Sequence, residues 1–236
     1  MRIVNVCLKR KLFLGVFDLL YCIFVCAGVD YEGDEDYDVH YRRCDGLHSD
    51  EILKETSGNL VWGADDNVIF YTTKDETMRP YQLWAHIVGT SQSEDFLLRT
   101  EEDGRFVLGI EKTRSERFLV AESCSKTSSE CALLDLHETQ DWVRKGREGE
   151  KEDPPSLTTV KPREQDVLYE VDHWVLSSND HTSQQDLLVI LTNIGGAKNF
   201  KVCVCPFFPT RQWEAPWADL IPHRSNVFVE GAECFQ

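Results

Sequence analysis

Short apolar or β-branched runs recur along the chain from about Ile52 to Pro209, and polar turn residues separate them. Glu102-Asp103-Gly104 and Gly195-Gly196 are two of these turns. No window keeps an apolar period of about 3.6 residues long enough for a stable helix. The pattern predicts an all-β fold of about eleven short strands, either a barrel-like fold or a sandwich. The predicted strands are Asn59–Trp62, Val68–Thr72, Tyr81–Val88, Phe96–Arg99, Arg105–Leu108, Arg117–Ala121, Ala132–Leu136, Val167–Val171, His173–Leu176, Leu187–Leu191 and Lys201–Cys205.

The N-terminal residues have the pattern of a secretory signal peptide. A basic segment ending at Lys11 precedes the apolar stretch Leu12–Val25, and small residues follow at Ala27 and Gly28. We therefore expect residues 1–28 to be cleaved and the mature chain to be secreted. An uncleaved anchor is the alternative, although the charge-free run Leu19–Val29 is much shorter than the roughly 20 residues that span a bilayer.

The remaining chain divides by composition into three parts. Residues 29–50 form an acidic leader, which we expect to be solvated. Residues 51–209 form the β domain, in which Arg144–Lys161, charged and containing Pro154-Pro155, is expected to be an exposed loop insertion. Residues 210–236 are too apolar for a free tail, so we expect this C-terminal extension to pack back on the β domain.

The net charge limits the kinds of partner that the chain is expected to bind. The net charge is −16, and removing residues 1–28 takes away four basic residues and one acid, which leaves −19. Binding to nucleic acid depends on neutralising phosphates with Lys and Arg, so neither nucleic-acid binding nor insertion into an anionic membrane is expected. Six of the nine cysteines remain after cleavage, an even number that permits three disulfides in a secreted protein.

Motifs of known catalytic chemistry do not occur along the chain. The seven histidines lack metal-ligand spacing, and no nucleophile elbow, phosphate loop or dinucleotide-binding turn is present. The sequence therefore predicts a protein that is not an enzyme and that needs no cofactor or metal. Catalytic residues that come from distant parts of a chain leave no such motif.

The segment Glu130–Trp142 resembles the signature of the fibroblast growth factor family. Cys131, Leu133, Asp135 and Trp142 occupy its Cys, apolar, acidic and aromatic places, with Asp in place of Glu and Trp in place of Tyr. Stretches that resemble other strands of the family follow in the same order and extend the resemblance to about residues 50–209. They are Gly58–Ile69, Tyr81–Trp84, Phe96–Leu108, His173–Val175 and Lys201–Pro209.

The resemblance implies a β-trefoil and a secreted growth factor that binds the ectodomain of a receptor tyrosine kinase, with a protein co-receptor as a further partner. By position, the family's receptor contacts fall on Asp135, Gln140, Trp142, Cys205 and Phe207. The family's heparan sulfate site is not matched, because Asn179-Asp180 and Phe200 stand where it has lysines. We therefore expect weak or no heparan sulfate binding.

Two other classes of protein fit parts of the pattern. An interleukin-1-like β-trefoil cytokine or antagonist would suit the acidity, although it suits the segment Cys131–Trp142 less well. A secreted protease inhibitor would need an exposed reactive loop, for which Arg144–Lys161 is the candidate. A lectin would repeat an aromatic-plus-carboxylate sugar site in each third of the chain, and the sequence shows no such repeat.

Overall fold

The computed structural model describes residues 2–12, 21–33, 35–43, 51–64, 67–148, 152–175, 186–207 and 216–234. The chain folds into two compact units, Met1–Glu102 and Asp103–Gln236. All the sheets are antiparallel, so the expectation of a mostly β protein is confirmed.

The first unit holds one seven-stranded sheet whose spatial order follows the chain. Its last four strands include most of the first four predicted strands, which are short apolar or β-branched runs. A short 3-10 helix η1 (Gln92–Glu94), capped by Ser91, precedes its last strand. The strands are β1 (Arg2–Leu12), β2 (Tyr21–Asp30), β3 (Tyr37–Arg43), β4 (Glu51–Trp62), β5 (Val68–Lys74), β6 (Pro80–Ile87) and β7 (Phe96–Thr100).

The segment expected to be a signal peptide contributes backbone to this sheet. Strand β2 pairs with β1 on one side and with β3 on the other, through Cys26↔Tyr41 among other pairs. Cleavage near Ala27 would therefore remove β1 and most of β2 from the sheet. Strand β3 also takes in the end of the segment expected to be a solvated leader, where Val39 and Tyr41 are buried.

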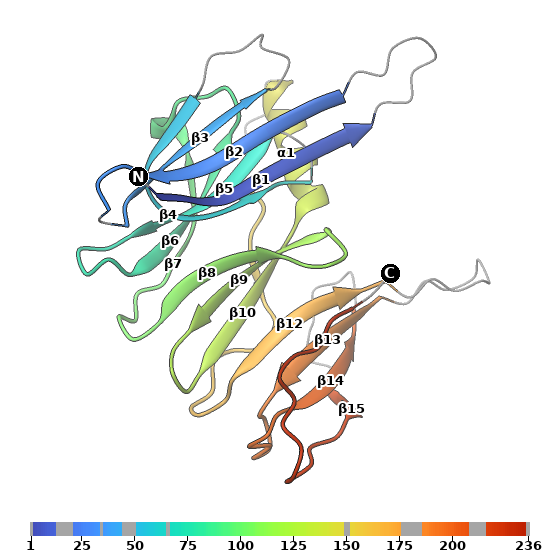
Figure 1. Ribbon diagram of the computed structural model, residues 1–236. Helices are drawn as coiled ribbons and strands as arrows, with labels where there is room; N and C mark the ends of the chain where they lie inside the picture. The colour runs from blue at the N-terminus through green and yellow to red at the C-terminus, as the bar shows by residue number, and fades with distance from the viewer. Residues whose placement is uncertain are drawn as a thin grey trace, which may run out of the picture. The chain divides into compact units, whose positions relative to one another are not determined.

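The second unit holds two four-stranded sheets, each a meander whose strands pair in chain order (Figure 1). The first comprises β8 (Val107–Lys112), β9 (Phe118–Cys124), β10 (Ser129–Asp135) and β11 (Thr158–Thr159). The second comprises β12 (Tyr169–Trp174), β13 (Leu187–Thr192), β14 (Lys201–Pro206) and β15 (Ala218–Ile221).

These two sheets share one core, built from every second residue of five strands. Strand β12 contributes Tyr169 and Val171, β13 contributes Leu188 and Ile190, and the other strands follow the same period. The opposite face of the second sheet, at Val189 and Leu191, packs against residues of the C-terminal segment such as Val229 and Cys234. The remaining members of the shared core are Phe118, Val120, Cys131, Leu133, Val160, Cys203 and Cys205.

The structure corrects the expected β-trefoil. Strands β1–β7, β8–β11 and β12–β15 form three separate antiparallel meanders, and each set pairs only within its own sheet. They therefore do not close into one common barrel. The local pattern predicted the strands, but alternation within a strand does not determine which strands become neighbours.

An α-helix, α1 (Leu136–Arg147), occupies the place where the sequence showed no helical period. Asp135 caps it by accepting a hydrogen bond from the backbone N–H of His137 at 2.9 Å. Its buried face consists of Leu136, Thr139, Trp142 and Val143, a stripe too short and too polar to detect in the sequence. Helix α1 extends into the segment Arg144–Lys161, which the sequence predicted to be a loop. The two-residue strand β11 lies near the C-terminal end of that segment.

The expected disulfides are not formed by the described cysteines. Cys124, Cys131, Cys203, Cys205 and Cys234 form no disulfide, and Cys44 lies outside the described residues. Three of these five are buried in the shared core, where a free cysteine packs as a small apolar side chain.

Candidate functional site

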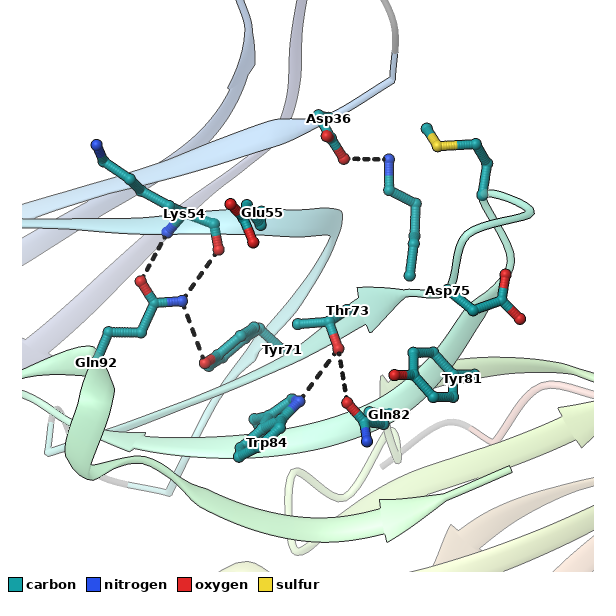
Figure 2. Close-up of a pocket in the computed structure, with 12 residues that line it drawn as sticks. Asp36, Lys54, Glu55, Tyr71, Thr73, Asp75, Tyr81, Gln82, Trp84 and Gln92 are labelled. Atoms are coloured by element: carbon teal, nitrogen blue, oxygen red, sulfur yellow. Dashed lines mark hydrogen bonds and ion pairs between the residues drawn. The ribbon is translucent and has the colours of Figure 1, made fainter. Parts of the chain in front are cut away.

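A pocket of about 450 Å³ opens in the first unit (Figure 2). Its walls come from β4, β5, β6, the turn between β5 and β6, η1 and the residue before β3. Its size is in the range of small-ligand sites, and its lining combines charged, amide and aromatic groups. The lining residues are Asp36, Lys54, Glu55, Tyr71, Thr73, Lys74, Asp75, Met78, Tyr81, Gln82, Trp84 and Gln92.

Hydrogen bonds hold the walls of this pocket in place. Trp84 Nε1 donates to Thr73 Oγ1 at 3.1 Å, which fixes the indole against β5. The Gln92 side chain joins η1 to β4, since its Nε2 donates to the Lys54 carbonyl and its Oε1 accepts from the Lys54 N–H, both at 3.0 Å. The Lys74 ammonium lies 2.6 Å from Asp36 Oδ1. The side chains are thus positioned before any ligand arrives.

A buried polar chain lies behind Tyr71. Tyr71 donates to Asp95 Oδ2 at 2.7 Å, Asp95 Oδ1 lies 2.7 Å from His86 Nδ1, and Tyr41 Oη lies 2.6 Å from His86 Nε2. Burial, followed by the hydrogen bond to Asp95, raises the pKa of Tyr71 well above its usual value. Tyr71 therefore stays protonated and remains a donor, and the chain joins β3 to β5, β6 and the start of β7.

A second polar cluster lies in the other unit, around Arg117. Its guanidinium donates to Asp135 Oδ2 at 3.2 Å and to Asp186 Oδ2 at 3.0 Å, and so it joins the two four-stranded sheets. His173 lies beside it, with Nδ1 2.8 Å from Ser115 Oγ and Nε2 3.5 Å from Asp186 Oδ2.

Ser115, His173 and Asp186 share the residue types of a serine-hydrolase triad, but their geometry does not suit catalysis. His173 has no exposed surface, and the rings of Phe118 and Phe207 stand 4.9 and 5.2 Å from it. Burial lowers the pKa of His173, which weakens it as a base. Asp186 is closer to Arg117 than to the imidazole, so it does not orient the ring by a hydrogen bond. The cluster joins the sheets rather than activating Ser115.

The structure brings together only some of the residues expected to contact a receptor. Asp135 binds Arg117, and the half-buried Phe207 ring lies 5.0 Å from the same guanidinium. Cys205 is fully buried in the shared core. Gln140 and Trp142 lie on α1, where Trp142 is buried and its Nε1 donates to the Glu152 carbonyl at 3.0 Å. Two of the five side chains are thus buried in the protein itself, and two of the remaining three join the cluster around Arg117.

Carboxylates on β8, β9 and β12 form a third polar region. Burial, reinforced by Glu170 and Glu111, raises the pKa of Glu122 to about 7. Among the residues that the structure describes, no group of three or more His, Cys, Asp or Glu side chains is arranged to hold a metal ion. In the same residues, no helix is long and apolar enough to cross a membrane.

The antiparallel meander sheets indicate the class of this protein. A four-stranded antiparallel sheet, repeated along the chain, is the blade of a β-propeller. Strands β8–β11 and β12–β15 are two such sheets, and β4–β7 are the last four strands of the seven-stranded sheet.

The family follows from comparison with known sequences. The sequence model of the prolyl oligopeptidase N-terminal β-propeller domain matches residues 23–236, and the chain belongs to this family. Dipeptidyl aminopeptidase BI of Pseudoxanthomonas mexicana is 34% identical over 211 residues, which are 87% of this chain and 25% of that protein. Protease 2 of Moraxella lacunata is 33% identical over 182 residues, which are 74% of this chain and 22% of that protein. The chain thus spans about a quarter of the length of these relatives.

Solved structures agree with this assignment. Oligopeptidase B from Leishmania major superposes with a TM-score of 0.69 and 30% identity, over 96% of this chain and 28% of that one. The closed form of oligopeptidase B from Trypanosoma brucei, with covalently bound antipain, gives a TM-score of 0.67 and 32% identity, over 88% of this chain and 26% of that one.

These comparisons overturn three expectations from the sequence. The resemblance to fibroblast growth factors is wrong, and with it the growth-factor function, because the signature residues lie on β10 and the capped helix α1 of a propeller blade. The expectation that the protein is not an enzyme is also contradicted, since the chain is homologous to serine peptidases. The succession of strands that begin at Glu51, Val107 and Tyr169, four to a group, was the signal that could have pointed to blades.

Proposed function

We propose that this chain is the propeller portion of a serine peptidase of the oligopeptidase B type, and that it handles the peptide substrate rather than cleaving it. The observation that carries the proposal is the family match over residues 23–236, together with antiparallel meander sheets, two of which have four strands. The names of the relatives support a peptide substrate, since two are peptidases and a third binds the peptide-like inhibitor antipain covalently.

The division of labour rests on the geometry of the described residues. The Ser115–His173–Asp186 contact is closed off by two phenylalanine rings and occupied by Arg117. Propeller blades offer rigid surfaces and loops instead, which suit the binding and selection of a peptide.

Active-site labelling of the intact protein that contains this chain tests the proposal. We expect hydrolysis of a fluorogenic peptide that antipain inhibits, and a fluorophosphonate label on a serine other than Ser115. The variant Ser115→Ala should hydrolyse the peptide as the parent protein does. Absence of antipain-sensitive hydrolysis would reject the peptidase assignment. A label on Ser115 that Ser115→Ala abolishes would instead reject the division of labour.

Secretion remains a separate prediction. The basic segment before Lys11 and the small residues at Ala27 and Gly28 support it. N-terminal sequencing of the protein purified from its own cells tests it, because a start near Val29 means that β1 and most of β2 have been removed. A start at Met1 or at Arg2 would show that both strands stay in the sheet.

A further inference from the structure

We propose that the pocket between β4, β5 and β6 binds a neutral sugar, a β-D-glucopyranose ring at the end of a glycan, which stacks on Trp84. The proposal concerns the first unit alone and does not depend on the peptidase assignment. It rests on an aromatic ring that is open to the pocket, on planar polar groups beside that ring and on the balance of charges around them.

Strands β5 and β6 present one face of a hairpin to the pocket. Tyr71 pairs with Trp84 across the two strands, and Thr73 pairs with Gln82. Because alternate residues of a strand point the same way, these four side chains share one face. Figure 2 shows Trp84 and Gln82 next to each other, each joined to Thr73. An aromatic ring and an amide group therefore lie side by side in the wall of the pocket.

Trp84 is the lining ring that remains open to a ligand. Tyr71 has only 2% of its surface exposed, and the Arg79 guanidinium lies over the Tyr81 ring, 5.6 Å from its centroid. Trp84 is half-buried, and its Nε1 donates to Thr73 Oγ1 at 3.1 Å, which fixes the plane of the indole. The C–H groups on the face of a sugar ring are weakly positive, so they pack well on the negative face of an indole.

Gln82 and Glu55 supply planar polar groups for the hydroxyls of the sugar. Gln82 Oε1 accepts from Thr73 Oγ1 at 3.4 Å, and the two donors on its Nε2 have no partner among the described residues. The exposed Glu55 carboxylate makes no ion pair within the described ranges and can accept from two neighbouring hydroxyls. The hydroxyls of β-D-glucopyranose are all equatorial, so the ring can stack by its face while its hydroxyls point sideways to these groups.

The charges around the pocket suit a neutral ligand. Asp36 pairs with Lys74 at 2.6 Å, and Asp75 pairs with Arg79 at 2.8 Å. The third lining carboxylate, Glu55, directly follows a lysine in the chain. Cations and carboxylates therefore balance at this site, and a neutral polar ligand needs only hydrogen bonds to replace the water that it loses.

The backbone that carries Glu55 is held before a ligand arrives. The Gln92 amide bonds to the N–H and to the carbonyl of the preceding residue, Lys54, both at 3.0 Å. Glu55 and Met78, both lining residues, have φ of 56° and 66°, in the left-handed region that is disfavoured for residues with a side chain. Such residues cluster at functional sites, and a fixed wall lowers the entropy that binding costs.

Titration calorimetry of the whole chain with methyl β-D-glucopyranoside tests the proposal. Its mirror image, methyl β-L-glucopyranoside, is the matched probe, because the two compounds have the same polarity and solvation and differ only in handedness. We expect the D form to bind with a dissociation constant of about 1 mM and the L form to bind at least about tenfold more weakly.

Three variants locate the site. Trp84→Ala should abolish binding of the D sugar. Gln82→Leu should weaken it about tenfold, because this variant loses the amide donors and keeps the ring. The control is Gln165→Leu, which replaces an exposed glutamine of the second unit and should leave binding unchanged. Circular dichroism should show that the variants keep the fold.

Equal binding of the two mirror images, unchanged binding in Gln82→Leu, or no saturable binding up to about 50 mM would each overturn the proposal. Trp84 also packs on the core of the first unit, so Gln82→Leu decides the outcome if Trp84→Ala does not fold. Peptidase activity of the intact protein is a separate measurement, so a negative result here leaves the proposed function intact.

Discussion

Each unit of the protein buries one histidine beside an aspartate, but the two histidines are satisfied to different extents. In the first unit, His86 has a partner on both ring nitrogens, at 2.6 Å from Tyr41 and 2.7 Å from Asp95. In the second unit, His173 Nδ1 meets Ser115, whereas its Nε2 has no hydrogen-bond partner in the described part of the chain.

The difference follows from what else binds the aspartate. Asp95 is shared by His86 and Tyr71, which approach different oxygens, so every contact keeps good geometry. Asp186 Oδ2 accepts a hydrogen bond from Arg117 Nη1 at 3.0 Å, and His173 Nε2 lies farther from the same oxygen, at 3.5 Å. A fully satisfied network stabilises the fold at every pH at which its protons stay in place, whereas a histidine buried with an open nitrogen makes stability depend on pH.

The largest effect is expected from removing the satisfied histidine. His86→Leu removes one hydrogen-bond partner each from the buried side chains of Asp95 and Tyr41, which should cost about 3 kcal/mol of unfolding free energy in the first unit. Denaturant unfolding with hydrogen exchange in β5 and β6 measures it. The control is His40→Leu, because the Tyr31–His40 bond at 2.9 Å is exposed. Equal losses in the two variants would show that the buried network adds nothing.

Removing the competing cation should have the next largest effect. Arg117→Met leaves Asp135 and Asp186 without their shared partner, and we expect a loss of about 2 kcal/mol in the second unit. Arg114→Met is the matched control, because its pair with Glu233 at 3.6 Å is about 60% exposed on both sides and is worth little. Urea unfolding of both variants tests this. A loss in Arg117→Met no larger than in Arg114→Met would mean that the cluster does not hold the two sheets together.

Titration of His173 should give a smaller, pH-dependent effect. Burial lowers its pKa in the folded state, although Asp186 and Asp172 partly oppose this and Arg117 adds to it. Below the usual pKa near 6.5, the unfolded state binds a proton that the folded state does not. Stability should therefore fall as the pH drops below about 6.5, by at most about 1.4 kcal/mol per pH unit.

The variant His173→Gln separates the contribution of His173 to the pH dependence of stability from that of the carboxylates. Glutamine has no charge to gain, so the difference in unfolding free energy between the parent protein and the variant should narrow from pH 7 to pH 5. A difference that stays constant over that range would show that His173 protonates equally in both states.

The smallest effect is expected at Glu122, where substitution should raise the stability rather than lower it. The pKa of Glu122 is raised to about 7, so the folded state holds a proton that the unfolded state has lost above pH 4.5. This penalty grows as the pH rises from 4.5 and is complete above 7. Glu122→Gln should therefore stabilise the second unit by about 1 kcal/mol at pH 8 and by less at pH 5. Thermal unfolding at the two pH values measures this, and equal gains at both would contradict it.

The strands were predictable from the sequence, because their signal is local. The runs Leu187–Leu191 and Lys201–Cys205 became β13 and β14 almost residue for residue, since alternate side chains had to reach the two buried faces. The helix α1 was missed, because two of the four buried side chains on its face are Thr139 and Trp142, which carry little helical signal. The same segment suggested the wrong family, since a signature of four residues recurs by chance.

The polar sites were not predictable, because their members lie far apart in the sequence. Tyr41 and His86 are 45 residues apart, and Arg117 and Asp186 are 69 apart. Neither spacing has a recognisable pattern, and each pair meets only after the sheets have formed. Asp135 was selected as a receptor contact, yet its carboxylate caps α1 and binds Arg117.

The sequence by itself determined the class of fold and the position of most strands, since both follow from which residues must avoid water. Only the tertiary structure decided that the strands pair as separate antiparallel meanders, because pairing depends on contacts between residues distant in the chain. It also decided which polar groups meet. Two histidines that look alike in the sequence became one fully bonded residue and one with an open nitrogen, because of the carboxylates that the folded sheets placed beside them.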